Sequence, residues 1–158
     1  MNPALAMSIA LALHVFAAVI WVGGMFFAHQ ILRPVAATQL EPPQRQALWV
    51  GVFSRFFPWV WVAIAVLFAT GYWMIFGFYD GFGSVRPYVH TMHALALVMT
   101  GIYLYVFFAP YQGLKKAVAA QAWPDGKKHI DRIRTMVGIN TIIGLLTIAV
   151  GAGGKYMS

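Results

Sequence analysis

The sequence predicts an all-α integral membrane protein, an up-and-down bundle of four spanning helices. Hydrophobic residues make up 61% of the 158 residues and charged residues only 9%, which is more apolar surface than a soluble domain of this size can bury. The apolar residues fall in four stretches, each long enough to supply the roughly 20 residues that cross a bilayer. The connections between them are short, which favours consecutive helices that lie side by side and antiparallel.

Four spans are expected, separated by segments with proline and glycine that interrupt helices. The spans lie at about residues 4–32, 48–76, 88–109 and 130–152. The connections are a polar loop, a glycine-rich turn and a longer lysine-containing segment, at residues 36–47, 77–87 and 111–129. Residues 1–158 thus form one transmembrane domain. Sliding the chain by half its length places His14 on His93 and Arg55 on Arg134, and we state as a hypothesis that two in-out hairpins are repeated.

The basic residues predict the orientation of the bundle. Two of them, Arg86 and Lys155, lie on the side of the termini and the glycine-rich turn, whereas the other nine lie in or beside the first and third connections. By the positive-inside rule, both termini lie on the outer, periplasmic side of a bacterial cytoplasmic (inner) membrane. The net charge of +7 therefore reflects topology and lipid contact, not nucleic-acid binding.

The composition excludes several kinds of site. The chain has no cysteine, which excludes disulfides, thiolate metal sites, iron–sulfur clusters and covalently attached haem. The four acidic residues all lie in connections or at helix ends: Glu41, Asp80, Asp125 and Asp131. Hydrolysis by paired carboxylates and proton pumping through buried carboxylates are therefore not expected.

Histidines within the spans are the main candidates for a site, because an intramembrane histidine is costly without a partner. His14 lies on one stripe of the first span with Trp21 and Met25. His90 and His93 are spaced i, i+3 in the first turns of the third span, at a similar depth. We expect His14 and His93 to meet across the bundle, with His90 as the alternative to His93.

Two imidazoles that face each other in a bundle suit the iron of haem b, with His14 and His93 as axial ligands. Trp21 and Met25 would line the cofactor, and Arg86 lies on the outer side, where the propionates would emerge. The alternative is that the histidines only form hydrogen bonds with hydroxyl or carbonyl groups of neighbouring helices.

His29 lies near the inner end of the first span, about 22 Å from His14 along the helix. This spacing is similar to that of the two haems in larger b-type cytochromes. The third span has no histidine at its inner end, however, so we expect an interfacial histidine beside Arg33.

Other polar residues and the methionines add further candidates. Arg55 and Arg134 flank the inner face, where they would contact an anionic substrate, a quinone oxygen or a lipid, or only extend to the interface. Asn140 is expected to form a hydrogen bond between helices.

The methionines raise the possibility of a copper site. Thioether and imidazole groups both suit copper, whereas methionine is also common in cores. The methionines near the histidines are Met7, Met25, Met92 and Met99.

Several short motifs resemble the CopD-like superfamily, which includes copper-resistance D domains and HemJ-type protoporphyrinogen oxidases. They are Leu13-His14-Val15, Trp21-Val22-Gly23-Gly24, Arg33, Arg55, the run from His93 to Val98, Arg134 and Asn140. The HemJ branch implies haem b, with the first-helix histidine, here His14, as a ligand, and oxidation of protoporphyrinogen with electrons passing to the membrane. The copper branch implies copper transport or tolerance.

The leading functional expectation is a haem-b membrane protein in electron transfer or oxidoreductase chemistry, with quinone or a porphyrin as partner. The first alternative is a copper transport or tolerance protein of the CopD type. The second is a cofactor-free membrane subunit or assembly factor that docks through glycine-rich helix faces. A second copy of the chain is a further candidate partner.

Overall fold

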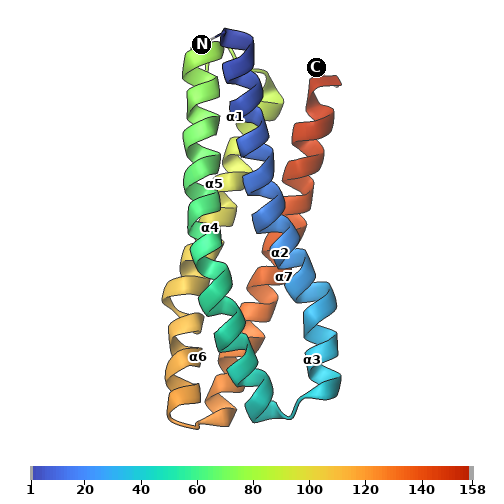
Figure 1. Ribbon diagram of the computed structural model, residues 1–158, viewed down its shortest axis with the longest axis vertical. Coiled ribbons are helices and arrows are strands. Elements are labelled where there is room, and N and C mark those ends of the chain that lie inside the picture. Colours follow the sequence, from blue (N-terminus) through green and yellow to red (C-terminus); the bar gives the residue numbers. More distant parts are fainter. Residues whose placement is uncertain (1, 157–158) are drawn as a thin grey trace.

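The computed structural model describes residues 2–156, and every regular element in that range is a helix (Figure 1). Four helices are long and apolar enough to cross a membrane, which confirms the predicted all-α class: Pro3–Gln39, Pro42–Phe78, Pro87–Ala119 and Trp123–Gly153. They run antiparallel in sequence order. The chain is therefore a multi-pass membrane protein whose helices contact lipid.

The first spanning helix, Pro3–Gln39, combines several segments without a break. Its α-helical parts are α1 (Pro3–Ala18), α2 (Gly24–Phe26) and α3 (Arg33–Gln39). Two π-helical turns, Val19–Gly23 and Phe27–Leu32, join them. The Asn2 side chain accepts a hydrogen bond from the Ala4 N–H at 3.0 Å, which caps the helix at its start.

The second spanning helix is α4 (Pro42–Phe78). The third consists of α5 (Pro87–Phe108) and α6 (Pro110–Ala119), with a change of backbone direction at Ala109. The fourth is α7 (Trp123–Gly153). In space, α1 packs on α4, whereas α5 and α6 both pack on α7.

Two of the predicted connections are wrong in extent. The predicted loop 36–47 is helical except at Leu40 and Glu41. The predicted segment 111–129 contains α6 from Tyr111 onward, the short link 120–122 and the start of α7. The prolines explain the difference, because Pro42 and Pro110 occupy the first position of their helices, where no N–H is needed. The polar composition of these segments reflects contact with water.

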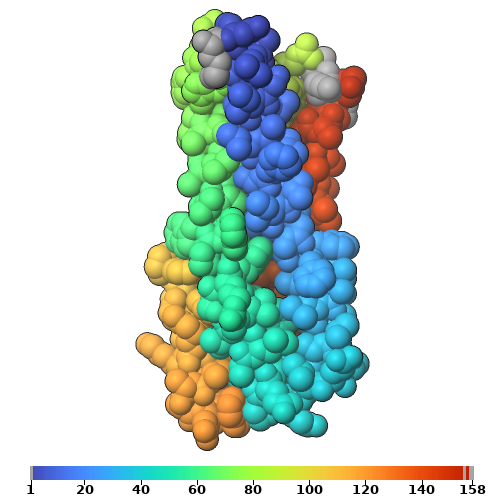
Figure 2. All heavy atoms as spheres, viewed as in Figure 1, coloured from blue at the N-terminus to red at the C-terminus, as the bar shows by residue number. Residues whose placement is uncertain are grey.

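The helices are longer than a bilayer requires. Thirty-seven residues, the length of α4, span about 55 Å, whereas the hydrocarbon core measures about 30 Å. Large exposed apolar side chains on α4 begin at Trp59, and those on α7 begin at Ile139. The end that carries α3 and α6, opposite both chain termini, therefore projects beyond the membrane (Figure 2).

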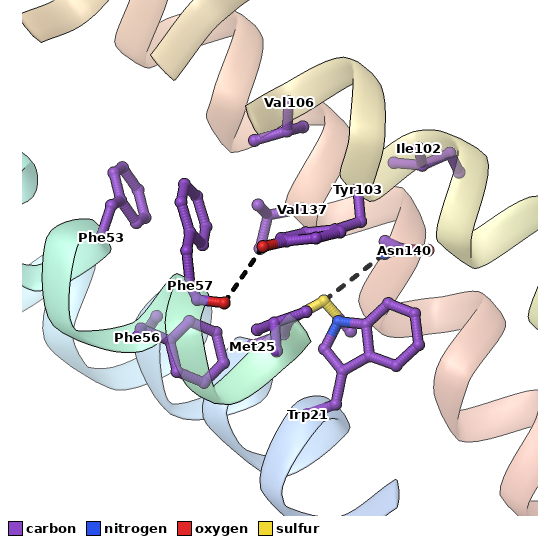
Figure 3. Close-up of a pocket in the computed structure, with 12 residues that line it drawn as sticks. Trp21, Met25, Phe53, Phe56, Phe57, Ile102, Tyr103, Val106, Val137 and Asn140 are labelled. Atoms are coloured by element: carbon purple, nitrogen blue, oxygen red, sulfur yellow. Dashed lines mark hydrogen bonds between the residues drawn. The ribbon is translucent and has the colours of Figure 1, made fainter. Parts of the chain in front are cut away.

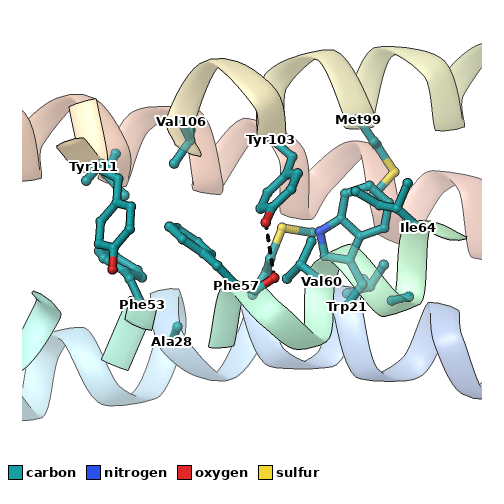
Figure 4. Close-up of a cluster of buried hydrophobic side chains, with 14 of the residues drawn as sticks. Trp21, Ala28, Phe53, Phe57, Val60, Ile64, Met99, Tyr103, Val106 and Tyr111 are labelled. Carbon is teal, nitrogen blue, oxygen red and sulfur yellow. Dashed lines mark hydrogen bonds between the residues drawn. The ribbon is translucent and has the colours of Figure 1, made fainter. Parts of the chain in front are cut away.

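A column of aromatic rings forms the core toward this projecting end (Figure 4). Trp49, Phe53 and Phe57 stack along α4, with ring centroids 5.2 Å and 5.1 Å apart. Tyr103 and Tyr111 meet Phe57 edge-on at 5.6 Å and 4.8 Å. These contacts hold α4 against α5 and α6, and they fix the floor of the internal cavity described below.

Gly126 provides a test of the packing at the projecting end. Gln46 is buried on α4 and its Nε2 donates to the Trp123 carbonyl of α7 at 2.8 Å. A Cβ on Gly126 would overlap the Gln46 amide. We expect Gly126→Ala to lower the free energy of unfolding by about 1–3 kcal/mol, as overpacking typically does, and to lower the melting temperature in detergent. The control is Gly101→Ala on α5, where the added Cβ has nothing within 4 Å; an equal loss of stability in both variants would contradict this account.

Candidate functional site

A small internal cavity lies where the first spanning helix meets α4, α5 and α7 (Figure 3). Its volume is about 20 Å³, which is room for about one water molecule or one metal ion. Most of the lining side chains are aliphatic or aromatic, and they are Trp21, Met25, Ala28, Phe53, Phe56, Phe57, Val60, Ile102, Tyr103, Val106, Val137 and Asn140.

Asn140 is the polar side chain that distinguishes this cavity. It is 2% exposed, and its Nδ2 donates to the Met99 carbonyl on α5 at 3.3 Å and to the Met25 Sδ at 3.7 Å. The predicted hydrogen bond between helices is thus confirmed. The Asn140 Oδ1, however, is buried and has no partner among residues 2–156. Such an unpaired carbonyl costs about 1–3 kcal/mol.

Local sequence explains how these groups reach one place. Trp21 and Met25 are four residues apart, so both point from one face of the first spanning helix toward the cavity (Figure 3). Gly144, one turn beyond Asn140, allows the helices to approach, since a Cβ there would lie 2.8 Å from Val22 Cγ2 and 3.1 Å from Met99 Cε. Small residues are the usual means of close packing between membrane helices.

Three methionine sulfurs follow α7 from the cavity toward the end of the bundle that holds both chain termini, and we call them the methionine row. Met25 Sδ lies beside Asn140, and Met99 Sδ lies 3.9 Å from the Thr147 hydroxyl. Met92 Sδ lies 3.2 Å from the position of a Cβ on Gly151. The row places thioethers at successive depths of the membrane-spanning region.

His14 precedes the cavity residue Trp21 on the first spanning helix, and its ring forms a hydrogen bond with α4. Its Nδ1 is 2.8 Å from the Thr70 Oγ1, and the ring packs on Gly71. The Thr70 hydroxyl donates to the Val66 carbonyl at 2.6 Å. Because a hydroxyl has one proton, Thr70 accepts from the His14 Nδ1–H, which leaves the Nε2 of His14 as the nitrogen with a free lone pair.

His93 has a separate partner on α4. Its Nε2 is 2.9 Å from the Tyr72 hydroxyl, and its ring lies among Phe68, Tyr72 and Phe82. His90 is exposed and lies 5.8 Å from the Phe82 ring. The histidines of the third span therefore belong to an aromatic cluster at the end of the bundle that holds the chain termini.

The structure gives His14 and His93 different hydrogen-bond partners on α4, so it does not show the predicted contact between the two rings. Their partners on α4, Thr70 and Tyr72, are two residues apart and therefore point to nearly opposite sides of the helix. Each imidazole is bonded to its own hydroxyl group, as in the alternative reading of the sequence. Trp21 and Met25, expected to line a haem, instead line the 20 Å³ cavity. These residues do not fit a haem clamped between His14 and His93.

The other predicted site residues are also placed apart. Arg86 is the residue before the first turn of α5. Arg55 Nη1 donates to the Gly51 carbonyl of its own helix at 3.3 Å, and Arg134 pairs with Asp131 at 3.6 Å. Across residues 2–156, no three or more His, Cys, Asp or Glu side chains gather in a metal-binding group. A metal site here would need other donors.

Comparison with known proteins identifies the family. The family profile of copper resistance protein D matches residues 50–153, which cover α4 from Val50 onward, α5, α6 and α7. The match covers well over half of the chain, so the chain belongs to the CopD family. No curated protein and no solved structure matches it.

Proposed function

We propose that this CopD-family protein handles copper(I) within the membrane, in copper transport or copper tolerance, and that the central cavity is its binding site. The observation that carries the proposal is the unpaired Oδ1 of Asn140, a residue whose Nδ2 contacts the Met25 thioether, at a cavity of ion size that both residues line. Copper(I) is the soft cargo that a thioether selects. A bound cation would also satisfy the amide oxygen, which otherwise lies buried without a partner.

The aromatic lining supports a monovalent cation. Trp21 lies over the cavity, and an indole face attracts a cation by about 0.5–2 kcal/mol. The described lining contains no acidic side chain, so a divalent ion would lack the charge compensation that buried charges require. The site therefore favours a singly charged, soft ion.

The methionine row supports a path between the cavity and the outer end. Met99 and Met92 present sulfurs above Met25 on the same side of α7. Weak neutral ligands at several depths suit passage, because a transported ion must bind well enough to enter and loosely enough to leave. This arrangement supports transport more than permanent storage.

Metal content and the visible spectrum test this function. Protein purified in detergent and loaded under reducing conditions is expected to bind about one copper(I) per chain, the capacity of an ion-sized cavity. It is expected to show no Soret band before or after reduction with dithionite. Stoichiometric iron with a Soret band would overturn the proposal in favour of haem, and a chain that binds neither metal would overturn it in favour of a cofactor-free subunit.

A further inference from the structure

His29 lies in an unusual place at the inner end of the first spanning helix. It belongs to the π-helical turn Phe27–Leu32, a conformation that often marks functional positions. Its Nδ1 is buried and has no hydrogen-bond partner among residues 2–156. On α7, Gly138 faces the ring, and a Cβ there would lie 2.9 Å from the His29 Nε2. The unpaired Nδ1 of His29 therefore lies between the first spanning helix and α7, where Gly138 leaves room for the ring. We call this place the seam.

Two arginines flank this seam. Arg33 and Arg134 both lie within electrostatic range of the His29 ring, and the backbone of Arg134 adjoins it. Asp131 pairs with Arg134 at 3.6 Å but also with Lys127 at 3.3 Å, and Arg134 remains 46% exposed. No carboxylate among the described residues forms an ion pair with Arg33. The seam therefore carries a net positive charge beside an unpaired ring nitrogen.

The charge decides which kind of ligand fits. A copper ion leaving the cavity would meet two guanidinium groups of the same sign, which disfavours a cation site at His29. A phosphate group suits the two arginines, because guanidinium groups bind its oxygens in a fork.

The level of the seam indicates where that phosphate comes from. Gly138 lies next to Ile139, where the large exposed apolar side chains of α7 begin, and the basic residues lie beyond it. The first spanning helix contacts α7 at this point through α2 and the turn after it (Figure 1). Seams of this kind at the boundary of the inner leaflet are suited to anionic headgroups.

We propose that the seam between the first spanning helix and α7 binds the phosphate of an anionic phospholipid headgroup, through Arg33 and Arg134 on either side of the His29 ring. This site does not depend on copper binding. It ties the inner end of the first spanning helix to the membrane surface and to α7.

The test measures lipid retention by native mass spectrometry of the full chain with phosphatidylglycerol. We expect Arg33→Gln and Arg134→Gln each to weaken retention by about five-fold. Arg55→Gln is the matched control, since Arg55 lies at the same end and contacts its own helix. Phosphatidylcholine is expected to be retained equally by all variants.

Two further measurements make the outcome decisive. Melting temperatures in detergent without added lipid are expected to match wild type for Arg134→Gln, because that side chain is half exposed. A loss of retention in Arg55→Gln as large as in Arg134→Gln would overturn the proposal. Displacement of the lipid by millimolar inorganic phosphate would overturn the lipid assignment in favour of a free-phosphate site.

Discussion

Replacing Met25 with leucine is expected to abolish tight copper(I) binding, with a loss of affinity of about 100-fold, at least as large as the loss that outer partners of a metal cause. The thioether is the soft ligand of the proposed site, and leucine offers no donor. Leucine and methionine have similar volumes, so the exchange is expected to change the free energy of unfolding by less than about 1.5 kcal/mol. The measurement is competition with a chromogenic copper(I) chelator, together with thermal unfolding.

The control for this substitution is Met136→Leu. Met136 packs against the same hydrophobic core but does not line the cavity. We expect its copper(I) affinity to equal that of wild type. If the two variants bind copper(I) equally well, Met25 is only a core residue and the proposed site is wrong.

Asn140→Leu is expected to have opposite effects on copper and on stability. The substitution removes the Oδ1 that the proposed ion would contact, so copper(I) affinity is expected to fall by about ten-fold or more. It also removes a buried carbonyl that has no partner, and the gain from removing it offsets the loss of the Nδ2 hydrogen bond to the Met99 carbonyl. Without metal, the melting temperature is therefore expected to stay constant or rise.

Thr141→Val is the matched control for Asn140. Thr141 is also buried, but its hydroxyl donates to the Val137 carbonyl of its own helix at 2.7 Å, and it does not line the cavity. Its copper(I) affinity is expected to be unchanged. If Asn140→Leu instead lowers the stability of the metal-free protein strongly and leaves copper(I) binding intact, Asn140 serves packing alone.

The number and apolar character of the helices could be predicted from the sequence, because hydropathy and chain length determine both. Their ends could not be predicted as well. Pro42 and Pro110 were interpreted as breaks, yet each occupies the first position of a helix. Proline can follow the end of one helix or occupy the first position of the next. The conformation of the neighbouring backbone determines which of these two roles a given proline has.

The histidines show a second limit. Depth along a helix follows from residue number, so His14 and His93 could be placed at similar depths. The rotation of each helix about its axis does not follow from hydropathy when the helix is apolar on every side. Thr70 and Tyr72 of α4 give each ring its own partner, and neither hydroxyl stands out in the sequence as a partner for a particular histidine.

The cavity could be predicted only in part. An isolated amide in an apolar span, Asn140, indicated a polar contact between helices, and Trp21 and Met25 were among the predicted site residues. The space itself arises from the volumes of side chains from four segments far apart in the sequence. No local sequence pattern indicates whether such side chains fill the centre of a bundle or leave room for one ion.

X-ray absorption at the copper edge tests the central claim most directly, on wild-type protein and Met25→Leu loaded with one equivalent of copper(I). We predict a sulfur neighbour of copper in wild type that is lost from the weakly bound copper of Met25→Leu, while the oxygen neighbour that Asn140 supplies is still present. Copper surrounded only by nitrogen and oxygen in wild type, or a sulfur neighbour that persists in Met25→Leu, would contradict the account.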